Sequence, residues 1–347
     1  MWQPIILTMM TAVCMAFCTL SVHGVDATAL AMRGMKMTSE EALELEKKLE
    51  QDPDDINART KLLGYYFQKK YSDKSALAAQ EAIVLWLVKN KPRAEVLRGS
   101  FARLDAVLNP DAYQEAKKEW LAHLKEHPAD LEILEMSAAF FLVQSRELAE
   151  QSLLKAQSLA PKDPKWPSKL GELYSLSVFN QSKHEKKTMA AKSFEQLELA
   201  YELTADDARD PMLGKLAKMA FESENTELAK KYATQMLKQS TNDWNTGNNV
   251  FSGNTILGRL ALRAKDVEKA KQYLLAAGKT TGSPQLGSFG PSMRLAKELI
   301  EAGETECVLE FFDLCSAFWG MGKERLEQWT RDVKQGSVPA FGANLNY

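Results

Sequence analysis

Apolar residues recur at helical spacing along most of the chain. From Ser39 onward, segments of about 12 to 18 residues carry apolar side chains three and four positions apart. Pro, Gly, Asn and Asp separate these segments, and no run shows the period-two alternation of a half-buried strand. The pattern predicts an all-α protein in which consecutive helices form pairs, as in a solenoid.

A fixed period underlies these pairs. Pro92, Pro128 and Pro161 are 36 and 33 residues apart, and proline ends a helical unit because it lacks an N–H. A pair of Leu and a small residue marks the helix that opens several units: Leu63-Gly64, Leu170-Gly171, Leu216-Ala217, Leu257-Gly258 and Leu295-Ala296. The small residue lets the two helices of a unit approach closely, so each unit reads as a helix-turn-helix.

This pattern resembles the tetratricopeptide repeat (TPR) family, whose units read Leu-Gly/Ala-x-x-Tyr, then Ala-x-x-x-Phe-x-x-Ala, then Pro. The best matches are 130–163, 210–243 and 251–284, and the degenerate ones lie near 57–92, 93–128, 164–203 and 289–322. The resemblance implies a TPR-like α-solenoid over residues 39–322, with about seven helical pairs. The C-terminal third also resembles a set of uncharacterised exported bacterial TPR proteins, which implies no particular activity.

The two ends of the array carry predicted capping helices. Residues 40–52 form the N-terminal cap, and residues 28–38 before it are predicted to be a flexible linker. Residues 323–347 hold a charged capping helix anchored by Trp329 and a tail that either docks or frays.

The first residues predict export. Residues 5–22 carry no charge, and small residues follow, so we expect a signal peptide over residues 1–27, cleaved after Gly24 or Ala27. The alternative is an uncleaved anchor, because 18 apolar residues just span a bilayer. The predicted location is secreted or periplasmic, or membrane-anchored by residues 5–22.

Composition narrows the class of function. The chain has 347 residues, with 44 Lys plus Arg and 46 Asp plus Glu, so its formal net charge is −2. A near-neutral chain gives no support to non-specific nucleic-acid binding. Cys307 and Cys315 lie eight positions apart on one predicted helix, too far for a disulfide, and we expect both to be small core residues.

One motif offers an enzymatic alternative. His123 to His127 read H-x-x-E-H, the pattern of inverted zinc proteases, in which two histidines share a metal. His127 precedes Pro128 at a predicted helix end, and His123 occupies a buried repeat position, so we expect a structural role. No cofactor, metal or catalytic residue is predicted.

Candidate binding residues come from two sources. The positions that line the groove of TPR domains imply a basic strip in the later units. Two segments rich in Asn, Gly, Ser and Pro, 244–254 and 280–291, are expected to be loops before helices and suit peptide or sugar recognition. Together they give the following set: Lys218, Phe221, Trp244, Asn248, Asn254, Arg259, Arg263, Gln285, Phe289 and Lys297.

The sequence therefore predicts an exported, non-catalytic scaffold that binds a peptide or protein partner through the concave TPR surface. Two alternatives stay open: a metal-dependent hydrolase that uses His123 and His127, and a self-assembling structural component of the cell envelope. The sequence predicts neither the partner nor the oligomeric state.

Overall fold

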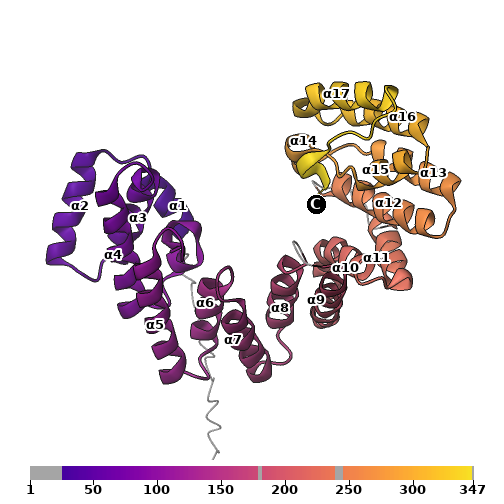
Figure 1. Ribbon diagram of the computed structural model, residues 1–347. Coiled ribbons are helices and arrows are strands. Elements are labelled where there is room, and N and C mark those ends of the chain that lie inside the picture. The colour runs from indigo at the N-terminus through magenta and orange to yellow at the C-terminus, as the bar shows by residue number, and fades with distance from the viewer. Residues whose placement is uncertain (1–25, 179–181, 239–244, 346–347) are drawn as a thin grey trace, which may run out of the picture. The chain divides into compact units, whose positions relative to one another are not determined.

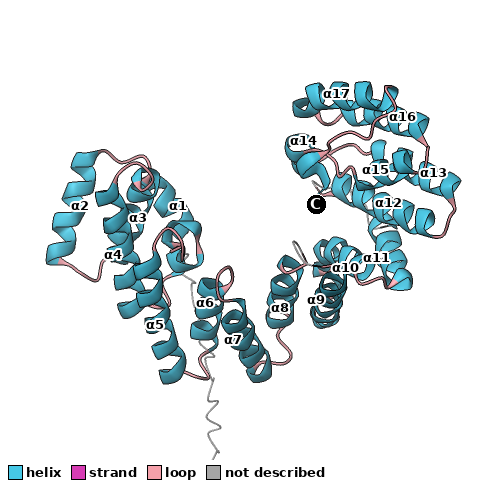
Figure 2. Ribbon diagram, viewed as in Figure 1, coloured by secondary structure: helices cyan, strands magenta, loops and turns pink. Residues whose placement is uncertain are grey.

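The computed structural model describes residues 26–178, 182–238 and 245–345 (Figure 1). Within those ranges the chain forms 17 α-helices and short 3-10 turns, and no strand is present (Figure 2). The predicted all-α class is confirmed. None of these helices combines the length and the apolar character that a membrane span requires. Residues 1–25 of the predicted signal segment, and Trp244, lie outside the described residues.

The chain divides into two compact units, residues 1–125 and 126–347. The helices of the first unit are α1 (Ala27–Gly34), α2 (Ser39–Gln51), α3 (Ile56–Lys69), α4 (Lys74–Asn90), η1 (Glu95–Arg98), η2 (Ser100–Ala102) and α5 (Pro110–Glu126), which ends one residue past the boundary. Helix α3 is central here, because α1, α2 and α4 all contact it. Its residues Leu62 and Leu63 are buried in the core.

Residues 28–38 contain an ordered helix where the sequence predicted a flexible linker. Leu30 and Ala31 of α1 are buried, because this helix packs against α3. The contact is so close that a methyl group on Gly64 would overlap the carbonyl oxygen of Ala31. The predicted N-terminal cap corresponds to α2, which begins with a capping box formed by Thr38 and Glu41.

The second unit consists of helix pairs that contact one another along the chain. Its helices are α6 (Leu131–Phe141), α7 (Arg146–Leu159), α8 (Lys165–Leu176), α9 (Lys183–Leu203), η3 (Asp206–Ala208), η4 (Asp210–Met212), α10 (Leu213–Glu222), α11 (Thr226–Lys238), α12 (Thr246–Arg263), α13 (Val267–Gly278), α14 (Pro284–Phe289), α15 (Arg294–Glu301), α16 (Thr305–Ser316), η5 (Gly320–Gly322), α17 (Lys323–Lys334) and η6 (Gly342–Leu345). Helices α6 and α7, α8 and α9, α10 and α11, α12 and α13, and α15 and α16 are packed neighbours. The first helices of the later pairs also meet, because α12 contacts both α10 and α15.

Aromatic packing closes the C-terminal end of this unit. Trp329 of α17 is buried and lies 5.0 Å from the ring centroid of Phe341 and 5.7 Å from that of Trp319. The tail therefore docks, at least as far as residue 345, because Phe341 and Asn344 are both buried.

Candidate functional site

A cavity of about 490 Å³ lies on α10, α12, α14 and the start of α15. This volume falls within the range of small-ligand pockets. The lining residues are Gly214, Lys218, Phe221, Glu222, Asn248, Phe251, Ser252, Thr255, Ile256, Arg259, Gln285, Leu286, Phe289, Gly290, Ser292 and Arg294. Six of the ten predicted binding residues are among them: Lys218, Phe221, Asn248, Arg259, Gln285 and Phe289.

Aromatic and aliphatic side chains supply the apolar part of the cavity. Phe221, Phe251 and Leu286 are buried, at 2%, 3% and 6% exposure, because their helices pack together there. Phe289 ends α14 and is 70% exposed. An exposed aromatic ring beside a buried apolar wall offers contact area to a ligand.

Two glycines bring α14 to the cavity. A methyl group on Gly247 would overlap the carbonyl oxygen of Gly282, so only glycine lets α12 begin this close to the segment before α14. The Thr280 hydroxyl donates to the Gly247 carbonyl at 2.9 Å and fixes that approach. Gly290 then ends α14 with a φ of +86°, a conformation that favours glycine.

The Asn-rich segment 244–254 is not a loop where the structure describes it, because residues 246–254 form the first turns of α12. The buried Asn254 does not line the cavity. Its amide donates to the Val250 carbonyl at 2.8 Å, and the Thr255 hydroxyl donates to the Phe251 carbonyl at 2.9 Å. Polar side chains that bond to carbonyls four residues earlier are compatible with a helix, which explains the error.

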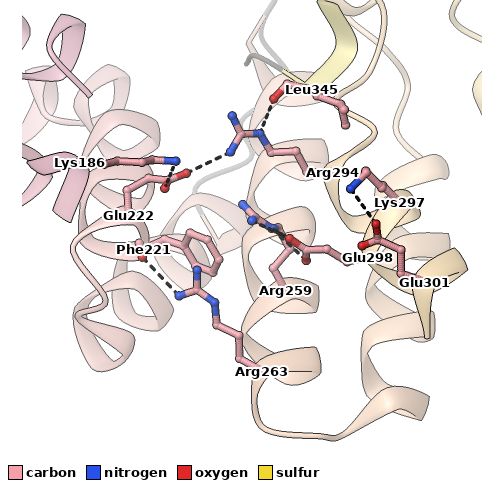
Figure 3. Close-up of polar contacts among 10 residues, drawn as sticks. All are labelled: Lys186, Phe221, Glu222, Arg259, Arg263, Arg294, Lys297, Glu298, Glu301 and Leu345. Carbon is pink, nitrogen blue, oxygen red and sulfur yellow. Dashed lines mark hydrogen bonds and ion pairs between the residues drawn. The ribbon is translucent and has the colours of Figure 1, made fainter. Parts of the chain in front are cut away.

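The predicted basic strip is largely engaged in internal contacts (Figure 3). Arg259 donates from Nε and Nη2 to Glu298 of α15, with Nη2–Oε1 at 2.7 Å. The guanidinium of Arg263 lies 3.7 Å from the ring centroid of Phe221, and Arg263 does not line the cavity. Lys297 pairs with Glu301 along α15 at 2.7 Å and also lies outside the lining.

Arg294 belongs to the site, although the sequence did not single it out. Its Nη1 lies 3.3 Å from Glu222, and its Nε donates to the Leu345 carbonyl at 2.6 Å (Figure 3). The sequence instead placed Lys297, three residues later, in the basic strip. The Gly290-Pro291 pair indicates that one helix ends there and that a separate helix begins a few residues later, as α15 does at Arg294.

Glu222 is the one acidic side chain among the described residues that line the cavity. It also pairs with Lys186 of α9 at 2.8 Å. Burial alone would raise the pKa of Glu222, but the Lys186 hydrogen bond and the nearby guanidinium groups outweigh burial and lower it. Glu222 is therefore an ionised partner for several cations.

Positive charge dominates the cavity around Lys218. Burial lowers the pKa of the Lys218 ammonium, and the Arg294 guanidinium lowers it further. Lys186 and Arg259 act in the same direction, whereas Glu222 opposes them. Such an environment favours a bound negative charge.

The H-x-x-E-H motif lies where α5 ends, and one ligand atom from each of His123, Glu126 and His127 lies within 4.8 Å of the others, a spacing that could hold a metal ion. The Nε2 of His123 lies 2.8 Å from the Val88 carbonyl, as a donor to that oxygen would. This contact suits the structural role, and the hydrolase alternative stays a prediction.

Comparison with known proteins found no matching family model and no similar curated protein.

Proposed function

We propose that the protein is an exported, non-catalytic interaction scaffold. A TPR-like α-solenoid would present a concave surface in its C-terminal half and bind a peptide or protein partner there. The observation that carries this proposal is the cavity on α10, α12 and α14, which is lined by six of the ten binding residues predicted from the sequence. Its combination of buried apolar wall, exposed ring and positive charge is typical of a recognition site.

The arrangement of the helices supports the TPR-like assignment. The proposed units 210–243 and 251–284 correspond in position to the packed pairs α10 with α11 and α12 with α13. In TPR domains the first helices of successive units line the groove, and here α12 contacts α10 and α15. The cavity lies on that side of the pairs, since α10, α12 and the start of α15 all contribute to it.

Export to the periplasm or the extracellular space rests on the uncharged segment 5–22. The partner would then be another envelope or secreted protein. No cofactor is part of the proposal.

The experiment is affinity capture by the chain 28–347 from the envelope and secreted fractions of its own host. Charge reversal at Arg259 would break its pair with Glu298 and confuse binding with folding. The informative variant is instead Phe289→Ala with Gln285→Ala, because both side chains are exposed at the cavity. The matched control is Leu154→Ala with Gln151→Ala, which alters two exposed residues of α7.

The proposal expects one partner to be retained by the native chain and by the α7 control, and to be lost from the cavity variant. Equal recovery with all three proteins would place binding elsewhere and contradict the proposal.

A further inference from the structure

At the polar rim of the cavity, internal hydrogen bonds engage the side-chain oxygens of Asn248 and Gln285. The Ser283 hydroxyl donates to Asn248 Oδ1 at 2.6 Å, and the Asn248 amide donates to Gln285 Oε1 at 3.1 Å. Among the described residues, Gln285 Nε2 makes no hydrogen bond. The Gln285 amide therefore offers a hydrogen-bond donor to a ligand that can accept.

The charged side chains of the cavity also favour a ligand that accepts hydrogen bonds and carries negative charge. Among the described residues, Lys218, Arg259 and Arg294 line the cavity, and Glu222 is the one carboxylate in the lining. Arg259 is paired with Glu298, which lies outside the lining, so Lys218 and Arg294 supply the cations for a ligand. Arg294 uses Nε and Nη1 in its contacts, and its Nη2 makes no hydrogen bond within the described parts of the chain. Each additional anion in this space would reduce repulsion among the cations.

Apart from the hydroxyl residues Ser252, Thr255 and Ser292, the remaining lining is apolar, and the cavity has room for a large side chain. Phe221, Phe251 and Leu286 form a buried wall, and Phe289 stands exposed beside it. A volume of about 490 Å³ leaves room for a large apolar group together with a neighbouring carboxylate.

We infer that the cavity receives a partner segment in which a large apolar side chain stands next to an Asp or Glu. The apolar group would lie against Phe221 and Phe251, and the carboxylate would accept from Lys218, Arg294 and the Gln285 amide. This inference rests on the proposed function, because it names the chemistry by which the same site recognises its partner.

The test uses an array of amidated, acetyl-capped peptides of the form Gly-Gly-X-Z-Gly-Gly. Position X is Phe, Leu or Ala, and position Z is Asp or Asn. We expect the native chain to prefer Phe-Asp and Leu-Asp over their Asn counterparts by at least about tenfold, since a charge-assisted hydrogen bond contributes that much. The Ala-Asp peptides should bind as weakly as the Asn peptides.

Two variants assign the preference to the cavity. Lys218→Met should reduce the ratio of Asp to Asn binding toward one, whereas Lys215→Met should leave it unchanged. Lys215 lies on the same helix but pairs with Glu172 and does not line the cavity. The ratio is informative because a general loss of folding would weaken both peptides alike.

Three outcomes would overturn the inference: equal binding of Asp and Asn peptides, no binding of any peptide, or a preference that survives Lys218→Met. A parallel titration with 4-phenylbutyrate tests a small organic acid as the occupant, and binding of that acid without any peptide would also contradict a partner segment. Failure here is distinguishable from failure of the proposed function, because the capture experiment depends on Phe289 and Gln285 and not on peptide charge.

Discussion

Arg259 and Glu298 join two helices through a forked ion pair. The Nε and Nη2 of Arg259 on α12 donate to the Glu298 carboxylate on α15 at 2.9 and 2.7 Å, and the Arg259 side chain is only 14% exposed. A planar guanidinium suits this two-point contact, which a lysine could not reproduce. Arg259, which the sequence predicted to bind a ligand, therefore also holds α12 against α15.

Arg259→Met should destabilise the protein by about 1–3 kcal/mol, because it leaves the half-buried Glu298 carboxylate without its main partner. Urea denaturation measures this change. Glu298→Gln and the double variant complete a double-mutant cycle, in which the pair predicts a favourable coupling energy. Additive effects of the two single changes would show that the ion pair contributes nothing.

Gly247→Ala should destabilise the protein by about 1–3 kcal/mol. The new methyl group would overlap the Gly282 carbonyl and push the start of α12 away from the segment before α14. Thermal unfolding measures the loss. Gly214→Ala is the matched control, since its methyl group would meet only Met236 Cε at 3.6 Å. The free energy of unfolding of this control should stay within about 1 kcal/mol of the native value, and we expect a small increase because alanine favours a helix more than glycine does. Similar losses in both variants would contradict the close approach.

The tail should hold the rim of the cavity in place. The Asn344 amide donates to the Pro291 carbonyl at 3.0 Å, and the Met293 amide donates to the Asn344 carbonyl at 2.8 Å. Asn344→Ala should cost about 1–3 kcal/mol and raise hydrogen exchange in residues 286–294 selectively. Unchanged exchange in that segment would show that the tail does not order it.

Lys218 should make stability depend on alkaline pH. Burial and the Arg294 charge lower its pKa below the ordinary 10.5, so its charged form is disfavoured in the folded state. This penalty is complete below the folded pKa and disappears as the pH rises through the folded pKa toward 10.5. The native chain should therefore gain stability relative to Lys218→Met between neutral pH and pH 10.5, as measured by urea denaturation. A difference that does not change with pH would contradict the lowered pKa.

The helical class could be predicted from the sequence because apolar spacing directly encodes a helix face. The capping helix near residues 40–52, the anchor Trp329 and the packed pairs α10–α13 follow from that spacing. The helix α1 was missed because its role depends on a contact with Gly64, more than thirty residues later, and no local pattern carries that information.

The site was predicted in part for a similar reason. Lys218, Phe221 and Arg259 line the cavity, and the groove positions implied by the TPR resemblance had predicted all three. Arg294 lines the cavity from the first position of α15, which begins shortly after Gly290 ends α14. Asn254 and Lys297 were misplaced because a residue type does not reveal whether its polar atoms bond within the helix or face a ligand.

The most direct measurement of the central claim is site-specific photo-crosslinking in the host. A p-benzoylphenylalanine would replace Phe289 at the cavity in one strain and Leu154 on α7 in another, both positions being exposed. If the cavity is the recognition site, light should produce a discrete covalent protein adduct from position 289 that is absent from position 154. The absence of an adduct at position 289, or the same adducts from both positions, would contradict the account.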